Sequence, residues 1–200
     1  MKSILEPFIN LFGEKIWAPA EFKRIGPFIN ENETVLDIGA GGGWTGQLIS
    51  ESKGAKVTLL DVKDFNHSSL PVTIYDGEKI PFEDNTFDVS LLLFVLHHCK
   101  DPEAVLKEAM RVSKRVIILE DTFYTWFGRL IVCTNDVLTN LPSFLMSKGG
   151  MSLPFQFRKT KEWTTLFNEL NTELAYIEQK QLFGLSPQKT LFILENRQVA

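Results

Sequence analysis

Short apolar runs, bounded by polar residues and glycines, recur along the first part of the chain. Segments with apolar residues at helical spacing lie between some of them, most clearly 44–51 and 102–112. Strands that alternate with helices are typical of a parallel sheet covered by helices on both faces. The runs with the length and aliphatic composition of buried strands are residues 35–38, 55–61, 72–75, 88–96 and 116–120.

The C-terminal part carries two further predicted strands, Leu174–Lys180 and Thr190–Glu195, joined through a turn with Gly184 and Pro187. Strands joined so tightly must be antiparallel, because parallel neighbours need a long crossover. The predicted fold is therefore α/β, with a mostly parallel sheet that ends in an antiparallel hairpin. No internal repeat is visible, and we expect one domain over residues 1–200.

A glycine-rich turn follows the first predicted strand, 35–38, and leads into a helix. Gly39, Gly41 and Gly43 cannot prolong a strand, and they leave no side chain between the main chain and a ligand. A glycine turn at a helix N-terminus favours a nucleoside-bearing ligand. Asp37 adds a carboxylate inside the strand, which suits a cationic or amine-bearing ligand better than a phosphate. The alternative is a flexible loop without a ligand.

Asp61 ends the second predicted strand, at the sheet edge where open α/β sheets bind ligands. A carboxylate offers two oxygens to the two hydroxyls of a ribose. This position indicates an adenosine ligand without distinguishing a dinucleotide from other nucleosides. A helix cap or a surface acid is the alternative interpretation.

Two motifs resemble class I S-adenosylmethionine-dependent methyltransferases, in particular the small-molecule, methyltransferase type 11-like group. The stretch from Asp37 to Gly43 matches their acid-x-Gly-x-Gly-x-Gly pattern. After the third strand, residues 76–78 (Asp-Gly-Glu) are followed by 80–82 (Ile-Pro-Phe) and, after an acidic turn, by 87–88 (Phe-Asp), as in that group. The resemblance implies a Rossmann-like sheet and S-adenosyl-L-methionine as cofactor.

The same resemblance implies roles for individual residues. Asp76 would meet the adenine amino group, and Gly77 would contact the ring through its backbone. The chain departs from the family in lacking the usual Pro-Gly-Gly turn before the fifth strand, which leaves the shape of that connection open. The cofactor-binding residues expected from the motifs and the resemblance are Asp37, Gly39, Ala40, Gly41, Gly43, Asp61, Val62, Asp76, Gly77 and Phe94.

His97 and His98 follow the fourth predicted strand and are candidates for a general base, because an imidazole titrates near neutral pH. Alternatively, one of them packs and the other caps the next helix. Methyl transfer itself needs no nucleophile on the protein, since alignment of the acceptor with the methyl group is the main contribution. Cys99 and Cys133 show no metal-ligand spacing with the histidines, so no metal is expected.

Two segments flank the predicted cofactor site. Residues 1–30 are expected to be helical, with breaks at Pro7, Gly13 and Pro19, and to pack on the sheet or to cover the site as a lid. Residues 121–157 form an irregular insertion rich in aromatic residues, which indicates an apolar or ring-bearing acceptor. A dimer face or a membrane-touching patch are alternative interpretations of the insertion. We expect a monomer or a homodimer.

Composition narrows the function classes. The net charge of −4 argues against a nucleic-acid partner, and the two cysteines give no disulfide framework, as in cytoplasmic proteins. No secretory signal or membrane span is predicted. The sequence thus predicts a methyltransferase that acts on a small, apolar or aromatic molecule. The alternatives are a catalytically silent binding or partner protein and a nicotinamide-dependent oxidoreductase, although the latter leaves Asp37 and Asp76 unexplained.

Overall fold

The computed structural model describes residues 14–146, 155–181 and 187–196. Its helices are α2 (Glu14–Ile25), α3 (Trp44–Lys53), α4 (Pro102–Val112), α5 (Trp126–Met146) and α6 (Thr160–Glu169), with the 3₁₀ turns η1 (Gly26–Phe28) and η2 (Leu96–His98). Its strands are β1 (Thr34–Ile38), β2 (Lys56–Asp61), β3 (Val72–Ile74), β4 (Phe87–Leu93), β5 (Ser113–Thr122), β6 (Thr172–Gln181) and β7 (Gln188–Asn196).

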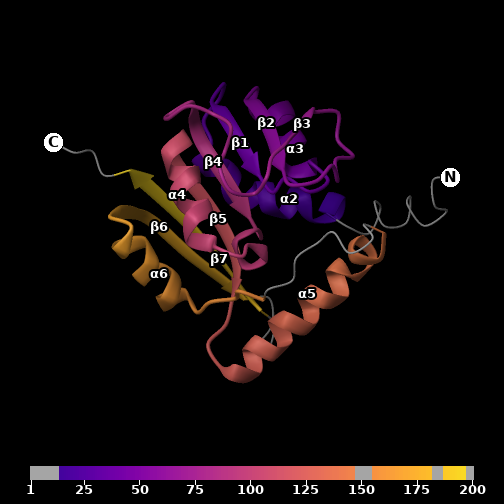
Figure 1. Cartoon of the computed structure of the whole chain (residues 1–200), viewed down its shortest axis with the longest axis vertical. Coiled ribbons are helices and arrows are strands. Elements are labelled where there is room, and N and C mark those ends of the chain that lie inside the picture. The colour runs from indigo at the N-terminus through magenta and orange to yellow at the C-terminus, as the bar shows by residue number, and fades with distance from the viewer. Residues whose placement is uncertain (1–13, 147–154, 182–186, 197–200) are drawn as a thin grey trace.

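The strands form one sheet in the order β3-β2-β1-β4-β5-β7-β6 (Figure 1). The pairs among β1 to β5 are parallel, whereas β7 is antiparallel to both β5 and β6. The predicted parallel sheet and its closing antiparallel hairpin are confirmed. Because all five parallel strands end at one edge, the polar residues that follow them are brought together there.

Helices cover both faces of the sheet, as predicted. Neighbouring residues of β1 point to opposite faces: Val35 packs in a cluster with Ile25 and Ile49 of α2 and α3. Leu36 packs in a second cluster with Leu106 of α4 and Trp163 of α6. Strands buried on both faces explain the continuous apolar runs in the sequence.

Three predicted boundaries are wrong. The fourth strand ends at Leu93, because Phe94 has φ +58° and the chain turns into η2 instead of continuing to Leu96. Helix α2 runs through Pro19, which was expected to break it; in an exposed helix, the cost is one lost hydrogen bond and local crowding. Strand β5 begins at Ser113, directly after α4, so no Pro-Gly-Gly-like turn is needed.

The insertion is more regular than expected, because residues 126–146 form the helix α5. Helix α5 packs against β5 (Figure 1). It carries Asp136 towards the residues that follow β4. The remaining parts of the two flanking segments, 1–13 and 147–154, lie outside the described residues.

Candidate active site

The turn after β1 is joined to the end of β2 by its backbone. The N–H groups of Gly39 and Ala40 both donate to the carbonyl oxygen of Leu60, at 2.8 and 3.2 Å. Gly39 has φ +68°, and a Cβ there would lie 2.6 Å from Cγ2 of Val95. The left-handed backbone and the close approach of Val95 both require glycine at this position.

The last glycine of the turn is required for a different contact. A Cβ on Gly43 would lie 2.6 Å from the side-chain oxygens of both Asn66 and Ser68, which belong to the loop after β2. The backbone of this loop also contacts the turn, since the N–H of His67 donates to Gly42 O at 3.1 Å. The glycines therefore let two loops meet at the carboxyl edge of the sheet.

Asp37 is buried in β1, with 4% of its surface exposed. A Cβ on Gly46 would lie 3.0 Å from its Oδ2, so the carboxylate lies close to the first turn of α3. The N-terminus of a helix carries a partial positive charge that stabilises a nearby carboxylate. This interaction gives the unusual strand acid a structural role in addition to any ligand contact.

Asp61 ends β2 and binds the glycine turn. Its Oδ2 accepts from Gly41 N at 2.9 Å, and its Oδ1 accepts from Val62 N at 2.7 Å and Lys63 N at 3.3 Å. Burial raises the pKa of this carboxyl above its ordinary value, and the three backbone N–H groups reduce that rise. The carboxylate therefore lies at the junction of β1 and β2, where the ribose was predicted.

The loop after β3 lies beside this junction. Asp76 is exposed, and its Oδ1 accepts from the N–H groups of Glu78 and Lys79 at 2.8 and 3.2 Å. A Cβ on Gly77 would lie 3.1 Å from Cγ1 of Val62. Val62 is 48% exposed. Gly77, predicted with Asp76 to meet the adenine, thus lies beside Val62, another predicted cofactor-binding residue, and the two follow neighbouring strands.

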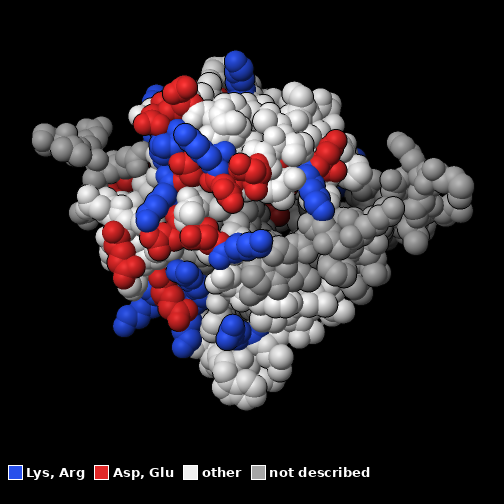
Figure 2. Space-filling model, viewed as in Figure 1, with Lys and Arg blue, Asp and Glu red and all other residues white. Residues whose placement is uncertain are grey.

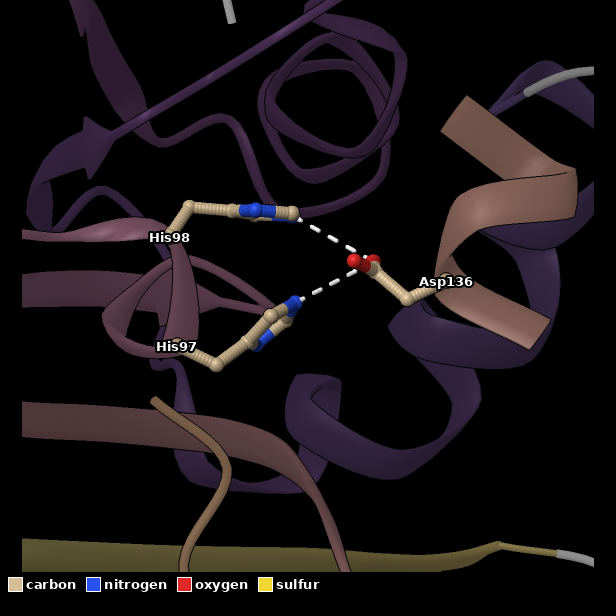
Figure 3. Close-up of side chains that lie close together, drawn as sticks. All are labelled: His97, His98 and Asp136. Atoms are coloured by element: carbon tan, nitrogen blue, oxygen red, sulfur yellow. Dashed lines mark ion pairs between the residues drawn. The ribbon is translucent and has the colours of Figure 1, made fainter. Parts of the chain in front are cut away.

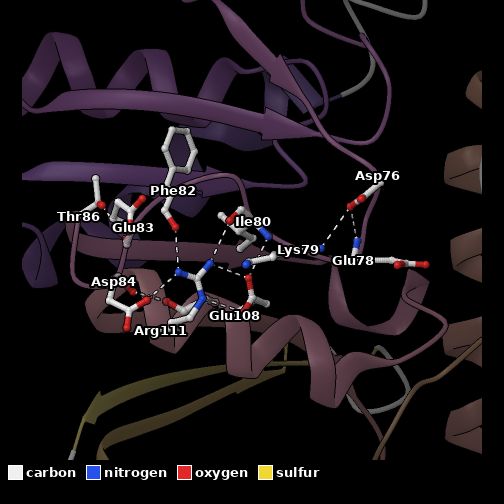
Figure 4. A network of polar contacts seen from close by, with 12 residues as sticks. Asp76, Glu78, Lys79, Ile80, Phe82, Glu83, Asp84, Thr86, Glu108 and Arg111 are labelled. Carbon is white, nitrogen blue, oxygen red and sulfur yellow. Dashed lines mark hydrogen bonds and ion pairs between the residues drawn. The ribbon is translucent and has the colours of Figure 1, made fainter.

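Arg111 of α4 holds the loop that follows (Figure 4). Its guanidinium donates to the carbonyl oxygens of Ile80 and Phe82 at 2.9 and 2.8 Å and to Asp84 Oδ1 at 2.8 Å. It also pairs with Glu108, whose Oε2 accepts from Ile80 N at 2.9 Å. Arg111 therefore holds the Ile-Pro-Phe motif against α4. A lysine could not replace it, because its ammonium group lacks the planar set of five N–H donors of a guanidinium.

Helix α2 lies against the start of α3. Glu21 Oε2 accepts from Thr45 Oγ1 at 2.6 Å, and Lys15 Nζ lies 4.3 Å from the centre of the Trp44 ring. Burial raises the pKa of Glu21, while its bond with Thr45 lowers it. The described part of the predicted N-terminal lid therefore packs beside the glycine turn.

His97 is enclosed by two carboxylates. Its Nδ1 lies 2.6 Å from Glu120 Oε2, and its Nε2 lies 3.5 Å from Asp136 Oδ1 (Figure 3). The ring of Phe157 stacks on the imidazole at 4.3 Å, and Glu120 Oε1 accepts from Leu96 N. Burial lowers the pKa of His97, but the neighbouring carboxylates of Glu120 and Asp136 outweigh this effect and raise the pKa to about 10.

His98 reaches the same carboxylate from the more open side. Its Nε2 lies 3.5 Å from Asp136 Oδ1, and 22% of its side chain is exposed, against 3% for His97. The two rings lie 4.1 Å apart (Figure 3). Of the two candidate bases, His98 is therefore the more exposed.

The sequence analysis missed Glu120 and Asp136. Glu120 carries the same signal as Asp61, an acid at the carboxyl end of an apolar strand, and could have been found by that rule. Asp136 lies on a helix beside the polar residues Thr134 and Asn135, and its sequence position gives no sign that it faces His97. Only the packing of α5 reveals it.

Phe94, predicted to lie near the cofactor, packs with the cluster under α2 and α3. Lys189 Nζ of β7 lies 4.1 Å from the centre of its ring and 3.9 Å from Asp121 Oδ1. Burial raises the pKa of Asp121, and Lys189 lowers it.

The hairpin of β6 and β7 thus brings a cation, Lys189, to the end of β5. Lys189 is another residue that the sequence analysis did not identify.

Comparison with known proteins identifies the family. Residues 36–116 match the family model described as "Methyltransferase domain". Residues 36–116 are therefore similar to methyltransferase domains. A SAM-dependent methyltransferase from Aquifex aeolicus has the same fold, with a TM-score of 0.64 and 16% identity over 94% of this chain and 97% of that one. The cyclase SpnF also has it, with a TM-score of 0.66 and 10% identity over 91% of this chain and 80% of that one.

Curated relatives of the methyltransferase domain include a protein of Streptomyces avermitilis named demethylmenaquinone methyltransferase, 31% identical over 67% of this chain and 61% of that protein. The chain spans about half to three fifths of the length of the first such relatives. The predicted family and fold are confirmed, and S-adenosylmethionine is the family's cofactor. No helix within the described residues is long and apolar enough to cross a membrane.

Proposed function

We propose that this chain transfers the methyl group of S-adenosylmethionine to a small, apolar or ring-bearing acceptor. One observation carries the proposal. The glycine turn, Asp61 and the pair Val62 and Gly77 meet at the carboxyl ends of β1, β2 and β3. A nucleoside with a cationic amino-acid tail fits that combination of bare backbone, buried carboxylate and exposed apolar side chain.

The residues present fit the cofactor. Asp61 accepts three backbone N–H groups, and because a carboxylate has about four acceptor positions, it can still receive a ribose hydroxyl. Val62 offers an apolar surface to the adenine, beside Asp76 and Gly77. Gly39, Ala40, Gly41 and Gly43 with Asp37 would hold the amino-acid end, and Phe94 would lie near it.

When bound, S-adenosylmethionine supplies an electrophilic methyl group on its sulfonium. The protein's part is to bind the acceptor in line with that group and to exclude water. Helix α5 and Phe157 enclose the carboxyl ends of β4 and β5, next to His98. The acceptor is proposed to enter on this side, where His98 is the more accessible of the two histidines.

The acceptor class is supported by the surface of the insertion. Trp126, Phe127, Leu130 and Leu138 of α5 are 78%, 47%, 53% and 66% exposed. Figure 2 shows charged side chains gathered over α4 and α6, with few on the part of α5 that is not grey. Together with the relatives named as quinone methyltransferases, this apolar surface favours a hydrophobic acceptor such as a hydroxylated aromatic ring.

Calorimetric titration with S-adenosylhomocysteine tests the cofactor assignment. We expect binding by the intact chain and a loss of affinity of about 10- to 100-fold in Asp61→Asn, because the carboxylate is exchanged for an amide with one acceptor oxygen. Asp64→Asn is the matched control, since Asp64 is exposed in the same loop, and it should change affinity less than about threefold. Equal affinity in the two variants would refute the assignment.

The catalytically silent protein is the second candidate, and the fold of the cyclase SpnF shows that this architecture also serves other chemistry. Transfer of labelled methyl groups to a panel of phenols, quinols and amines separates the two. Tight cofactor binding with no product across the panel would favour the silent protein. Stabilisation by NAD in place of the sulfur nucleoside would favour an oxidoreductase.

A further inference from the structure

Three potential metal ligands converge where α5 meets the turn after β4. They belong to His97, His98 and Asp136, which each offer one ligand atom, and these three atoms lie within 4.8 Å of one another (Figure 3). Both histidines come from η2, whereas Asp136 comes from α5. The cluster is largely shielded from water, with side-chain exposures of 3%, 22% and 9%. It therefore combines two imidazoles and one carboxylate at a protected point of the candidate active site.

The spacing within the cluster suits a shared ion. Asp136 Oδ1 lies 3.5 Å from Nε2 of each histidine, longer than the 2.6 Å between His97 Nδ1 and Glu120 Oε2. Direct charge-assisted hydrogen bonds are usually about 2.7–2.9 Å long. Two donors that each lie about 2.1 Å from one tetrahedral metal ion are separated by about 3.4 Å. The observed separations match the second arrangement better than the first.

Glu120 fixes the orientation of the first ligand. Its contact with His97 Nδ1 directs Nε2 of that ring towards Asp136. Metal-binding histidines commonly give their second ring nitrogen to a carboxylate in this way, which sets the tautomer and increases the basicity of the ligand. Glu120 is itself held by Leu96 N at 2.7 Å and is completely buried.

The surrounding charge also favours a cation. The carboxyl groups of Glu120, Asp121 and Asp136 all lie at this end of β5 and α5, and Lys189 pairs with Asp121 at 3.9 Å. Buried carboxylates are costly unless a positive charge accompanies them. A divalent ion between Asp136 and two neutral imidazoles would supply that charge in place of a protonated His97.

We propose that His97, His98 and Asp136 bind one first-row transition-metal ion, such as Zn²⁺, with Glu120 as the group that orients His97. Two imidazoles and one carboxylate select such ions over Mg²⁺ and Ca²⁺, which prefer oxygen ligands alone. Three protein ligands leave at least one coordination position for water or for an oxygen of a bound molecule. The site does not depend on methyl transfer, so it can be tested whether or not the proposed function holds.

Titration with Co²⁺ tests the proposal on the full chain. Bound metal is first removed with a chelator, and the protein is then exchanged into metal-free buffer. We expect one Co²⁺ per chain with visible d–d absorption, displaced by Zn²⁺ and unaffected by Mg²⁺. His98→Asn and Asp136→Asn should each weaken binding by at least ~100-fold, since each removes a ligand. Glu120→Gln should weaken it by about 10- to 100-fold, as expected for a group that orients a ligand.

The controls use the remaining histidine and the cysteines. His67→Asn removes an exposed imidazole, and the double variant Cys99→Ser/Cys133→Ser removes the thiols; both should keep the Co²⁺ spectrum. Circular dichroism confirms the fold of each variant, and the partly exposed His98 provides a variant that tolerates substitution if Asp136→Asn does not fold. Absence of stoichiometric Co²⁺ binding, or unchanged affinity in His98→Asn, would overturn the proposal. In that case, His97 would be protonated and would pair with Glu120 and Asp136 without a metal ion.

Discussion

The two sides of the candidate site are built from different kinds of contact. At the cofactor side, β1, β2 and β3 bring together backbone groups and residues close in sequence, such as Asp61 and Gly41. At the acceptor side, His97 contacts Glu120, Asp136 and Phe157, which come from three separate later segments of the chain. The family model covers residues 36–116, so it includes the cofactor side and ends before α5.

Under the proposed function, this difference would let one fold keep its cofactor while its acceptor changes. Backbone N–H groups and glycines are insensitive to most substitutions elsewhere, so the cofactor side has a recognisable local pattern. The acceptor side depends on side chains from an added helix, and a different helix would place different groups next to His98. We therefore expect the two sides to respond differently to substitution.

The largest effect is expected at the glycine turn. Gly39→Ala combines a left-handed backbone, which costs about 1–2 kcal/mol, with a Cβ that would lie 2.6 Å from Val95. We expect a loss of about 3–4 kcal/mol in the free energy of unfolding, measured in urea. The control is Gly128→Ala in α5, where the nearest atoms lie at 3.4 Å and helix propensity favours alanine. Equal losses in both variants would contradict the packing argument.

Glu120→Gln tests the buried pair at the acceptor side. Removing one charge of a buried pair typically costs about 3 kcal/mol, because the remaining group loses its partner. We expect that loss in chemical denaturation, while the affinity for S-adenosylhomocysteine changes less than twofold. Glu178→Gln, which breaks the more exposed pair with Arg24, should cost at most about 1 kcal/mol. A large fall in cofactor affinity would mean that the two sides are not separate.

Arg111→Met tests whether the clamp on the loop of Figure 4 supports the cofactor side from a distance. Its guanidinium holds two carbonyls and two carboxylates, so its loss should cost about 2 kcal/mol. The affinity for S-adenosylhomocysteine should fall severalfold, because Asp76 and Gly77 precede this loop. Arg129→Met in α5 is the matched control and should leave that affinity unchanged. If both variants bind S-adenosylhomocysteine with the same affinity, Arg111 stabilises the loop without supporting cofactor binding.

The smallest effect concerns Asp88 at the opposite edge of the sheet. The hydrogen bond from Lys114, followed by those from Thr34, holds its pKa at about 2, below the ordinary 3.8. A lowered carboxyl pKa stabilises the fold above the unfolded pKa, and this stabilisation disappears as pH falls towards 2. Because its side chain is 31% exposed, we expect Asp88→Asn to cost about 1 kcal/mol at pH 7. Urea titrations at pH 7 and pH 3 should show the difference shrinking; a constant difference would exclude an ionic origin.

Local sequence determined the sheet and the cofactor side, because the signals there are local. The apolar runs, the glycine turn from Gly39 and the acid at the end of β2 each act through backbone geometry or strand position, and the structure brings Asp61, Val62 and Gly77 together as those positions require. The end of β4 at Phe94 escaped prediction, because its apolar run continues past the residue with positive φ.

Tertiary packing alone decided the acceptor side. That Asp136 faces His97 and His98 depends on where α5 docks, and α5 is joined to the rest of the described chain through a small apolar cluster of Val132 with Phe123 and Phe157. No spacing in the sequence links position 136 to position 97. The distance of 3.5 Å between Asp136 Oδ1 and His97 Nε2 is set by two elements that meet only when the sheet is complete.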